Sequence, residues 1–121
     1  MDCIFCKIIN NEIPSYTVFE DDIVKVFLNI NPDTNGHLLI IPKKHVLALQ
    51  EIDNETLLHI MEIARKMQKQ LKEKLNIDGL TLIQNNGDAQ EVKHYHLHLV
   101  PFYNKKQELN DIRIIYEKLT K

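Results

Sequence analysis

Polar and apolar residues alternate strictly at positions 94–99, within the stretch 90–101. The alternate positions hold three histidines and three apolar or aromatic residues: His94, His96, His98, Tyr95, Leu97 and Leu99. This alternation predicts a β-strand. Successive side chains of a strand point to opposite faces, so we expect the histidines on one face and the other three in the core. Pro101 has no amide donor and predicts the strand's end or an edge position.

Other hydrophobic patterns predict an α+β fold. Strands are expected at residues 16–19, 23–28, 37–42 and 80–84, separated by polar turns. The continuous apolar run 38–41 is typical of a central strand with both faces covered. Short connections between successive strands favour an antiparallel meander, with a long helix packed on one face.

Helical spacing of apolar residues predicts three helices. The first spans residues 3–9 and ends at Asn10. A long helix begins after a cap at Asp53 or Asn54 and ends by Gly79. His59 of this helix is expected on the surface. The repeating apolar positions, the two methionines included, are expected in the core: Leu57, Ile60, Met61, Ala64, Met67, Leu71 and Leu75. The tail 104–121 is expected to form a short amphipathic helix: Leu109, Ile112, Tyr116 and Leu119.

Length and charge narrow the functional classes. A chain of 121 residues predicts one domain, residues 1–121. A net charge of −2 argues against nucleic acid or an anionic membrane surface as partners. The chain has no apolar run near the roughly 20 residues of a membrane span, and its start does not resemble a signal peptide. We therefore expect a cytoplasmic protein with reduced cysteines, whose Cys-x-x-Cys spacing favours a metal or redox role.

Three alternating histidines suggest chemistry rather than packing. A lone histidine among apolar residues is usually a surface or a satisfied core residue, but burying three side by side is costly in desolvation. Such a row can bind a metal, or it can supply a nucleophile, an acid and an orienting group around a phosphate. A catalytic zinc bound by all three is disfavoured, because alternate positions on a straight strand span too far for one ion.

The pattern Gln-x-Val-x-His-x-His-x-His at residues 90–98 resembles the histidine-triad (HIT) family of nucleotide hydrolases and transferases. Four further segments resemble the family in its own order: 3–9, 13–15, 19–22 and 36–45. Over residues 1–103 the chain is most similar to the Cys-x-x-Cys bacterial branch, near the Hint-type nucleoside phosphoramidases. The resemblance implies a HIT-like fold with an antiparallel meander sheet and the three helices above. It also implies a homodimer whose sheets join across a twofold axis.

Two cysteines and two histidines would suit tetrahedral zinc, and four protein ligands argue for a structural ion. The spacing alone does not choose among six histidines. The resemblance implies the set Cys3, Cys6, His45 and His94. We hypothesise that structural Zn²⁺ pins the N-terminal helix to the sheet; the alternative is a pair of free buried cysteines.

The resemblance also implies roles around a phosphate. His96 would attack the α-phosphate of a purine nucleotide or nucleoside phosphoramidate and become nucleotidylated, its other ring nitrogen being held by a backbone carbonyl beside His94. His98 and His37 would line the phosphate site. Gln90 would lie near the scissile bond, and Asn85 would contact the phosphate or ribose side.

An apolar nucleoside pocket is implied near the N-terminal helix and the first hairpin. The matching positions are Ile4, Phe5, Ile8, Phe27, Ile30 and Leu39. For each of them taken alone, a plain core residue is the favoured interpretation.

The chain departs from the family at two places. Asn29 stands where an acidic residue commonly accepts hydrogen bonds from the ribose, so we expect weaker or less ribose-selective binding. The loop 85–90 is about two residues shorter than usual and lacks the glycine before Gln90, while Glu91 adds a carboxylate.

The leading hypothesis is an enzyme, a phosphoramidase or nucleotidyl transferase. Alternatives are a dinucleoside polyphosphate hydrolase and a nucleotide-binding module with little turnover. His98 argues against the uridylyltransferase branch, which carries glutamine there.

Overall fold

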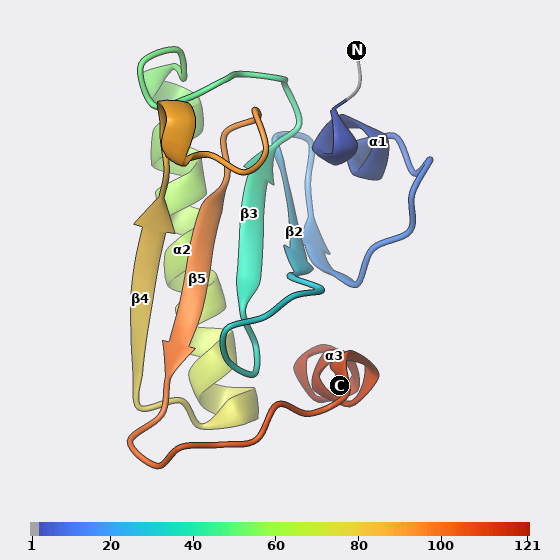
Figure 1. The fold of residues 1–121 in the computed structure, drawn as a ribbon, viewed down its shortest axis with the longest axis vertical. Coiled ribbons are helices and arrows are strands. Elements are labelled where there is room, and N and C mark those ends of the chain that lie inside the picture. The colour runs from blue at the N-terminus through green and yellow to red at the C-terminus, as the bar shows by residue number, and fades with distance from the viewer. Residues whose placement is uncertain (1–2) are drawn as a thin grey trace.

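A computed structural model describes residues 3–121 as three α-helices and one antiparallel sheet of five strands (Figure 1). The strands are β1 Thr17–Glu20, β2 Val24–Leu28, β3 Leu38–Pro42, β4 Gly79–Gln84 and β5 Leu97–Phe102. The helices are α1 Ile4–Ile9, α2 Asn54–Leu75 and α3 Ile112–Thr120. This arrangement confirms the α+β class and the expected elements. The strand order β1-β2-β3-β5-β4 shows that only the first three strands follow the chain, since β5 lies between β3 and β4.

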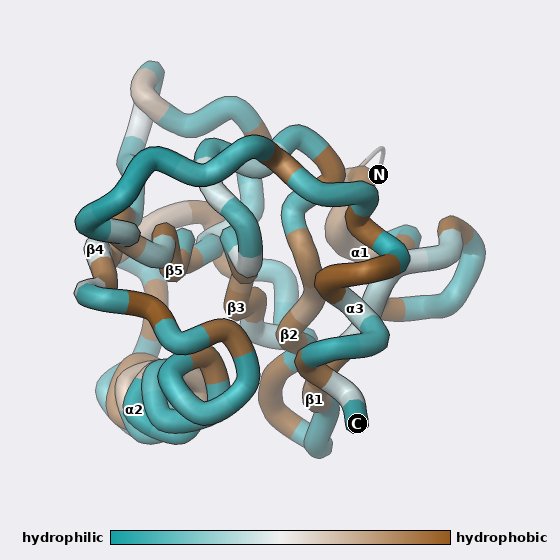
Figure 2. Tube along the Cα trace, turned by 90° about the horizontal axis from the view of Figure 1, so that it is seen from below, coloured by the Kyte–Doolittle hydropathy of each residue, from teal (hydrophilic) through white to brown (hydrophobic). Residues whose placement is uncertain are grey.

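The buried core lies on both faces of the sheet. All five residues of β3 are buried, as a central strand requires. Alternate residues of β2, from Val24 to Leu28, pack with Tyr95, Leu97 and Leu99 toward α2. Phe27 and Leu39 pack on the opposite face against α1. In Figure 2 the apolar segments of β2 and β3 lie in the middle of the molecule, between α2 and α1.

The long helix α2 begins as expected but differs at two positions. The Asp53 side chain caps it by accepting a hydrogen bond from the Thr56 amide, at 3.1 Å. Asn76 ends it in the left-handed conformation, with φ 54°, so the assignment of Gly79 as terminator was wrong; Gly79 opens β4. Met67 is buried, but Met61 is 39% exposed, contrary to expectation. Met61 lies one residue, about 100°, beyond Ile60 and therefore on the flank of the apolar stripe.

The histidine strand is shorter than the alternation predicted. β5 begins at Leu97, so His94 and His96 lie in the irregular segment before it. This segment lies beyond the β3–β5 ladder, because β3 pairs with β5 only as far as Ile40 opposite Leu97. The Tyr95 amide instead donates to the Val46 carbonyl, at 2.8 Å. The alternation of faces persists all the same, and β5 ends one residue after Pro101.

The tail reaches α3 through a stretch without regular structure. Leu109 lies outside the helix and is 56% exposed, whereas Ile115 and Leu119 are buried in the α2 core. Buried Asn35 holds this stretch with a hydrogen bond to the Glu108 carbonyl, at 3.0 Å. His59 is not a free surface residue, since its Nε2 lies 2.7 Å from Asp21 Oδ2 at the β1–β2 turn. None of the described helices is long and apolar enough to span a membrane.

Candidate active site and metal centre

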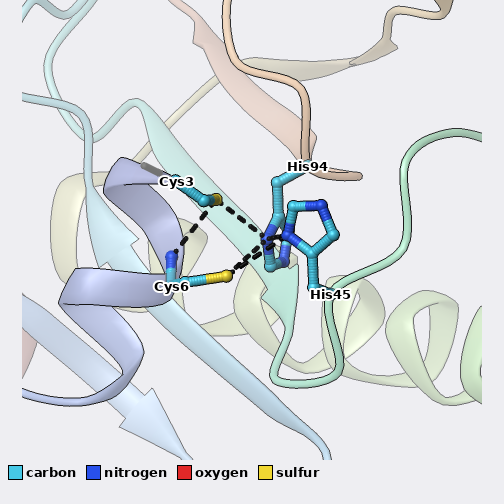
Figure 3. A group of neighbouring side chains, drawn as sticks. All are labelled: Cys3, Cys6, His45 and His94. Carbon is cyan, nitrogen blue, oxygen red and sulfur yellow. Dashed lines mark hydrogen bonds between the residues drawn. The ribbon is translucent and has the colours of Figure 1, made fainter. Parts of the chain in front are cut away.

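Four sulfur and nitrogen ligands meet at one point between α1 and the sheet (Figure 3). Cys3 caps α1 and Cys6 lies one turn later, so both thiols are on one side of the helix. His45 follows β3, and His94 precedes β5. Their ligand atoms all lie within 4.8 Å of one another. We call Cys3, Cys6, His45 and His94 the metal centre.

The spacing of these atoms fits a tetrahedral zinc ion. Cys6 Sγ lies 3.2 Å from His45 Nδ1, and Cys3 Sγ lies 3.4 Å from His94 Nδ1. The two Nδ1 atoms are 3.1 Å apart. Tetrahedral zinc, with bonds of about 2.0–2.3 Å, would hold its ligands about 3.3–3.8 Å apart. The four residues predicted from the resemblance are therefore the four that the fold assembles.

The surroundings prepare this centre for a cation. His94 is fully buried, and its Nε2–H donates to the Pro42 carbonyl at 2.8 Å, which leaves the Nδ1 lone pair facing the thiols. Burial, reinforced by the neighbouring Cys3 thiol, raises the pKa of Cys6 to about 11. A bound zinc ion would supply the positive charge that stabilises the Cys6 thiolate.

His96 leaves Nε2 free, whereas His94 leaves Nδ1 free. Its Nδ1–H donates to the His94 carbonyl at 2.7 Å, the hydrogen bond that the resemblance led us to expect. The Nε2 lone pair is therefore left for another atom. The ring is 4% exposed, and Phe5 packs edge-on against it with ring centres 5.0 Å apart.

A chain of hydrogen bonds fixes the proton of His98. The Asp33 amide donates to His37 Nδ1 at 3.1 Å, so the neutral His37 ring carries its proton on Nε2. That Nε2–H donates to His98 Nδ1 at 2.9 Å, which leaves the His98 proton on Nε2. Burial lowers the pKa of His37. Burial, with the neighbouring His96 and His37 rings, lowers the pKa of His98 to about 4. Both rings are thus neutral near pH 7, and His98 offers an N–H donor.

His37, His96 and His98 share a cavity of about 280 Å³, which we call the histidine pocket. The other lining residues are Asn29, Asn31, Asp33, Ile83, Asn85, Glu91 and Val100. A larger hollow of about 690 Å³ lies between the end of α2 and the tail, but its walls hold no histidine or cysteine among the described residues. Of these two cavities, the histidine pocket is therefore the candidate active site. The three triad histidines do not converge on one point, since His94 faces the cysteines and His98 faces His37.

The residues expected around the nucleoside separate into two groups. Four of them, Phe5, Ile8, Phe27 and Leu39, are buried together beneath α1. Phe5 packs edge-on against His96 of the pocket, and Leu39 is paired with His98 across β3 and β5. Ile4 and Ile30 are 47% and 73% exposed and lie outside the walls of the histidine pocket.

Gln90 and Asn29 are placed differently from each other. Gln90 is buried, and its Nε2 donates to the Leu47 carbonyl at 2.7 Å, so its amide lies outside the walls of the histidine pocket. Its Oε1 has no hydrogen-bond partner among the described residues. Asn29 does line the pocket, but its Oδ1 already accepts a hydrogen bond from the Asn31 amide at 2.9 Å.

Sequence reasoning missed the part played by Asp33. Its backbone amide sets the tautomer of His37, and an amide carries no side-chain signature. The only available signal was position, four residues before His37 in a segment rich in turn formers.

Comparison with known proteins agrees with this geometry. A sequence model of the HIT domain matches residues 10–105. The chain belongs to the histidine-triad (HIT) family. A HIT-like protein of Methanocaldococcus jannaschii is 44% identical over 88% of this chain and 84% of its own length. The adenosine 5′-monophosphoramidase of Saccharomyces cerevisiae is 44% identical over 88% of this chain and 66% of its own length.

Solved structures of the HIT family share the fold. A zinc-bound histidine triad protein from Mycobacterium smegmatis superimposes with a TM-score of 0.91 at 31% identity, covering 99% of this chain and 91% of its own. A HIT-like protein from Bartonella henselae gives a TM-score of 0.89 at 36% identity, covering 98% and 95%. The family, with phosphoramidases among its members, supports a general nucleotide hydrolase role for this HIT protein.

Proposed function

We propose that this HIT protein cleaves nucleoside 5′-phosphoramidates at the α-phosphate through a nucleotidyl intermediate on His96. The observation that carries the proposal is the pair of fixed tautomers in the histidine pocket. His96 offers a lone pair on Nε2, and His98 beside it offers an N–H, with ring centres 4.9 Å apart. A nucleophile next to a donor is the arrangement that group transfer at phosphorus requires. Relatives named adenosine 5′-monophosphoramidases support the same chemistry.

In the first step the His96 Nε2 lone pair forms a bond to phosphorus while the P–N bond breaks toward nitrogen. The leaving nitrogen takes one proton from solvent, while His98 Nε2–H donates a hydrogen bond to a phosphoryl oxygen. In the second step water attacks phosphorus, the bond to His96 breaks with its electron pair returning to Nε2, and one proton goes back to solvent. The products are an amine and the nucleoside monophosphate. Another nucleophile in place of water would make the same protein a nucleotidyl transferase.

The charges of the histidine pocket favour phosphoramidates over dinucleoside polyphosphates. Asp33 and Glu91 line the pocket, and no lysine or arginine does so among the described residues. A polyphosphate brings several negative charges, whereas a phosphoramidate monoester brings one. Repulsion by two carboxylates therefore penalises the polyphosphate more strongly.

We propose structural Zn²⁺ at the metal centre, bound by Cys3, Cys6, His45 and His94. It would supply a crosslink between α1 and the sheet, and α1 carries Phe5 against His96. Thiolate ligands must remain reduced, which agrees with a cytoplasmic location.

We further propose that the protein is a homodimer joined at β4. This strand is an edge of the sheet, and it carries exposed Leu82 and Ile83 without a proline or a charge. Such an edge is suited to pairing with a second copy. Light scattering after gel filtration should give twice the monomer mass of 14.2 kDa, and Leu82→Lys should shift the protein toward the monomer. A monomeric wild type would contradict the proposal.

The proposed function is tested with AMP-lysine in a single turnover, followed by a search for AMP attached to the protein. AMP release with a trappable adduct is expected, and both should disappear in His96→Ala. His59→Ala, which removes a histidine from α2, is the matched control and should keep both. Tight AMP binding without turnover would overturn the enzyme and indicate a binding module.

A further inference from the structure

We infer that Glu91 makes this protein select substrates whose leaving group carries a positive charge. The inference rests on the proposed phosphoramidase function and adds a substrate class to it. The favoured leaving groups would be amines that carry a second, cationic amine, such as a diamine or the side chain of a lysine derivative.

Glu91 lies at the pocket in which we propose that phosphoryl transfer takes place. It lines the histidine pocket together with His96 and His98, and it also lines the adjoining hollow around Cys3 and His45. Its backbone is held between two partly or fully buried neighbours, Gln90 and Val92. The Gln90 side-chain amide donates to the Leu47 carbonyl, so the backbone next to Glu91 is held to the loop after β3.

The second carboxylate of the pocket lies on another connection. Asp33 belongs to the turn between β2 and β3, together with Asn29, the residue expected near the ribose. Glu91 belongs to the segment that continues into His96. Of the two, Glu91 also lines the adjoining hollow and Asp33 does not, so Glu91 is the carboxylate that a leaving group directed into that hollow would meet.

No cation in the pocket offsets this charge among its described lining residues. His37 and His98 are kept neutral by burial, as described above. Lys93 lines the adjoining hollow, and its Nζ is engaged with the Gly87 carbonyl at 2.6 Å. A cationic leaving group would thus be the available partner for Glu91, and a carboxylate there would be repelled.

The test uses three AMP phosphoramidates with the same four-carbon linker, AMP–NH–(CH₂)₄–X. The group X is an ammonium, a hydroxyl or a carboxylate. Glu91 is exposed, so we expect the cationic substrate to exceed the neutral one in kcat/KM by about three- to fivefold, the upper part of the range of an exposed ion pair. The anionic substrate should be slowest. The ratio should fall as salt rises, because exposed charges are screened.

Glu91→Gln should bring the cationic-to-neutral ratio close to one, and Glu91→Lys should invert it. Glu62→Gln is the matched control, since it removes the same charge from the exposed side of α2 and should keep the wild-type ratio. Equal kcat/KM for the three substrates in the wild type, or an unchanged ratio in Glu91→Gln, would overturn the inference and leave the phosphoramidase intact. Hydrolysis of none of the three would overturn the proposed function and the inference with it.

Discussion

The metal centre and the histidine pocket are built from neighbouring histidines of one segment, and yet they present opposite ring nitrogens. His94 donates from Nε2 to the Pro42 carbonyl and turns Nδ1 toward the cysteines. His96 donates from Nδ1 to the His94 carbonyl and leaves Nε2 for the pocket. A backbone carbonyl thus decides which lone pair is offered, and one residue type becomes a metal ligand or a nucleophile accordingly.

Removing His96 should abolish the chemistry of the histidine pocket and leave the metal centre intact. His96→Ala should lower the turnover of AMP-lysine by more than about 10³-fold, because the nucleotidyl intermediate loses its only bond to the protein. The zinc content should stay equal to that of the wild type, since His96 lies outside the metal centre. Parallel turnover and metal assays check both. Loss of zinc together with activity would mean that the two sites are not separable.

Removing the cysteines of the metal centre should abolish zinc binding and destabilise the fold. Cys3→Ala with Cys6→Ala should abolish zinc binding and lower the free energy of unfolding. The loss would be about 4 kcal/mol when free zinc exceeds its dissociation constant about 1,000-fold. Urea denaturation with and without a chelator measures the effect. The chelator should destabilise the wild type and leave the double variant unchanged; an equal response of the two would argue against a structural ion.

Acid should destabilise the histidine pocket. Burial and the neighbouring His96 and His37 rings hold the pKa of His98 at about 4 in the folded protein, below its ordinary value of 6.5, while Asp33 opposes the shift. Between these two pH values the unfolded chain binds more protons, so the free energy of unfolding should fall as the pH drops from 6.5 toward 4. His98→Gln should show a smaller fall over the same interval by urea denaturation. The acidic groups with lowered pKa, among them Asp21 and Asp111, titrate equally in both proteins and cancel in the difference.

The smallest expected effect concerns the ribose. Asn29 Oδ1 is already used by the Asn31 amide, so a carboxylate there would add acceptor capacity for a ribose hydroxyl. Asn29→Asp should tighten AMP binding by about 1 kcal/mol, roughly fivefold, and change 2′-deoxy-AMP binding less. Calorimetric titration of both ligands is the measurement. Unchanged affinity for both would contradict a ribose contact at this position.

Local sequence patterns were sufficient to predict the elements and the chemistry they carry. The alternation at 94–99, the apolar run at 38–41 and the stripe of α2 each depend on neighbours a few residues away. The resemblance added the ligand set and the triad, because the family motifs occur in order along the chain. Local patterns were less reliable at element ends and flanks: Met61, Gly79 and Leu109 each fitted a helical pattern or signal without sharing its role.

The contacts between distant segments depend on the packing of the whole fold and could not be predicted from local patterns. The insertion of β5 between β3 and β4 brings the His94 segment beside the end of β3, and that placement supplies Pro42 and Val46 as partners. The same packing turns Gln90 toward Leu47 and leaves Glu91 at the histidine pocket. Tautomers follow from these contacts, since the ring nitrogen that faces an acceptor is the one that carries the proton. The acceptor of His96 is local, two residues away, but those of His94 and His37 come from residues far away in sequence, whose positions the packing of the whole sheet determines.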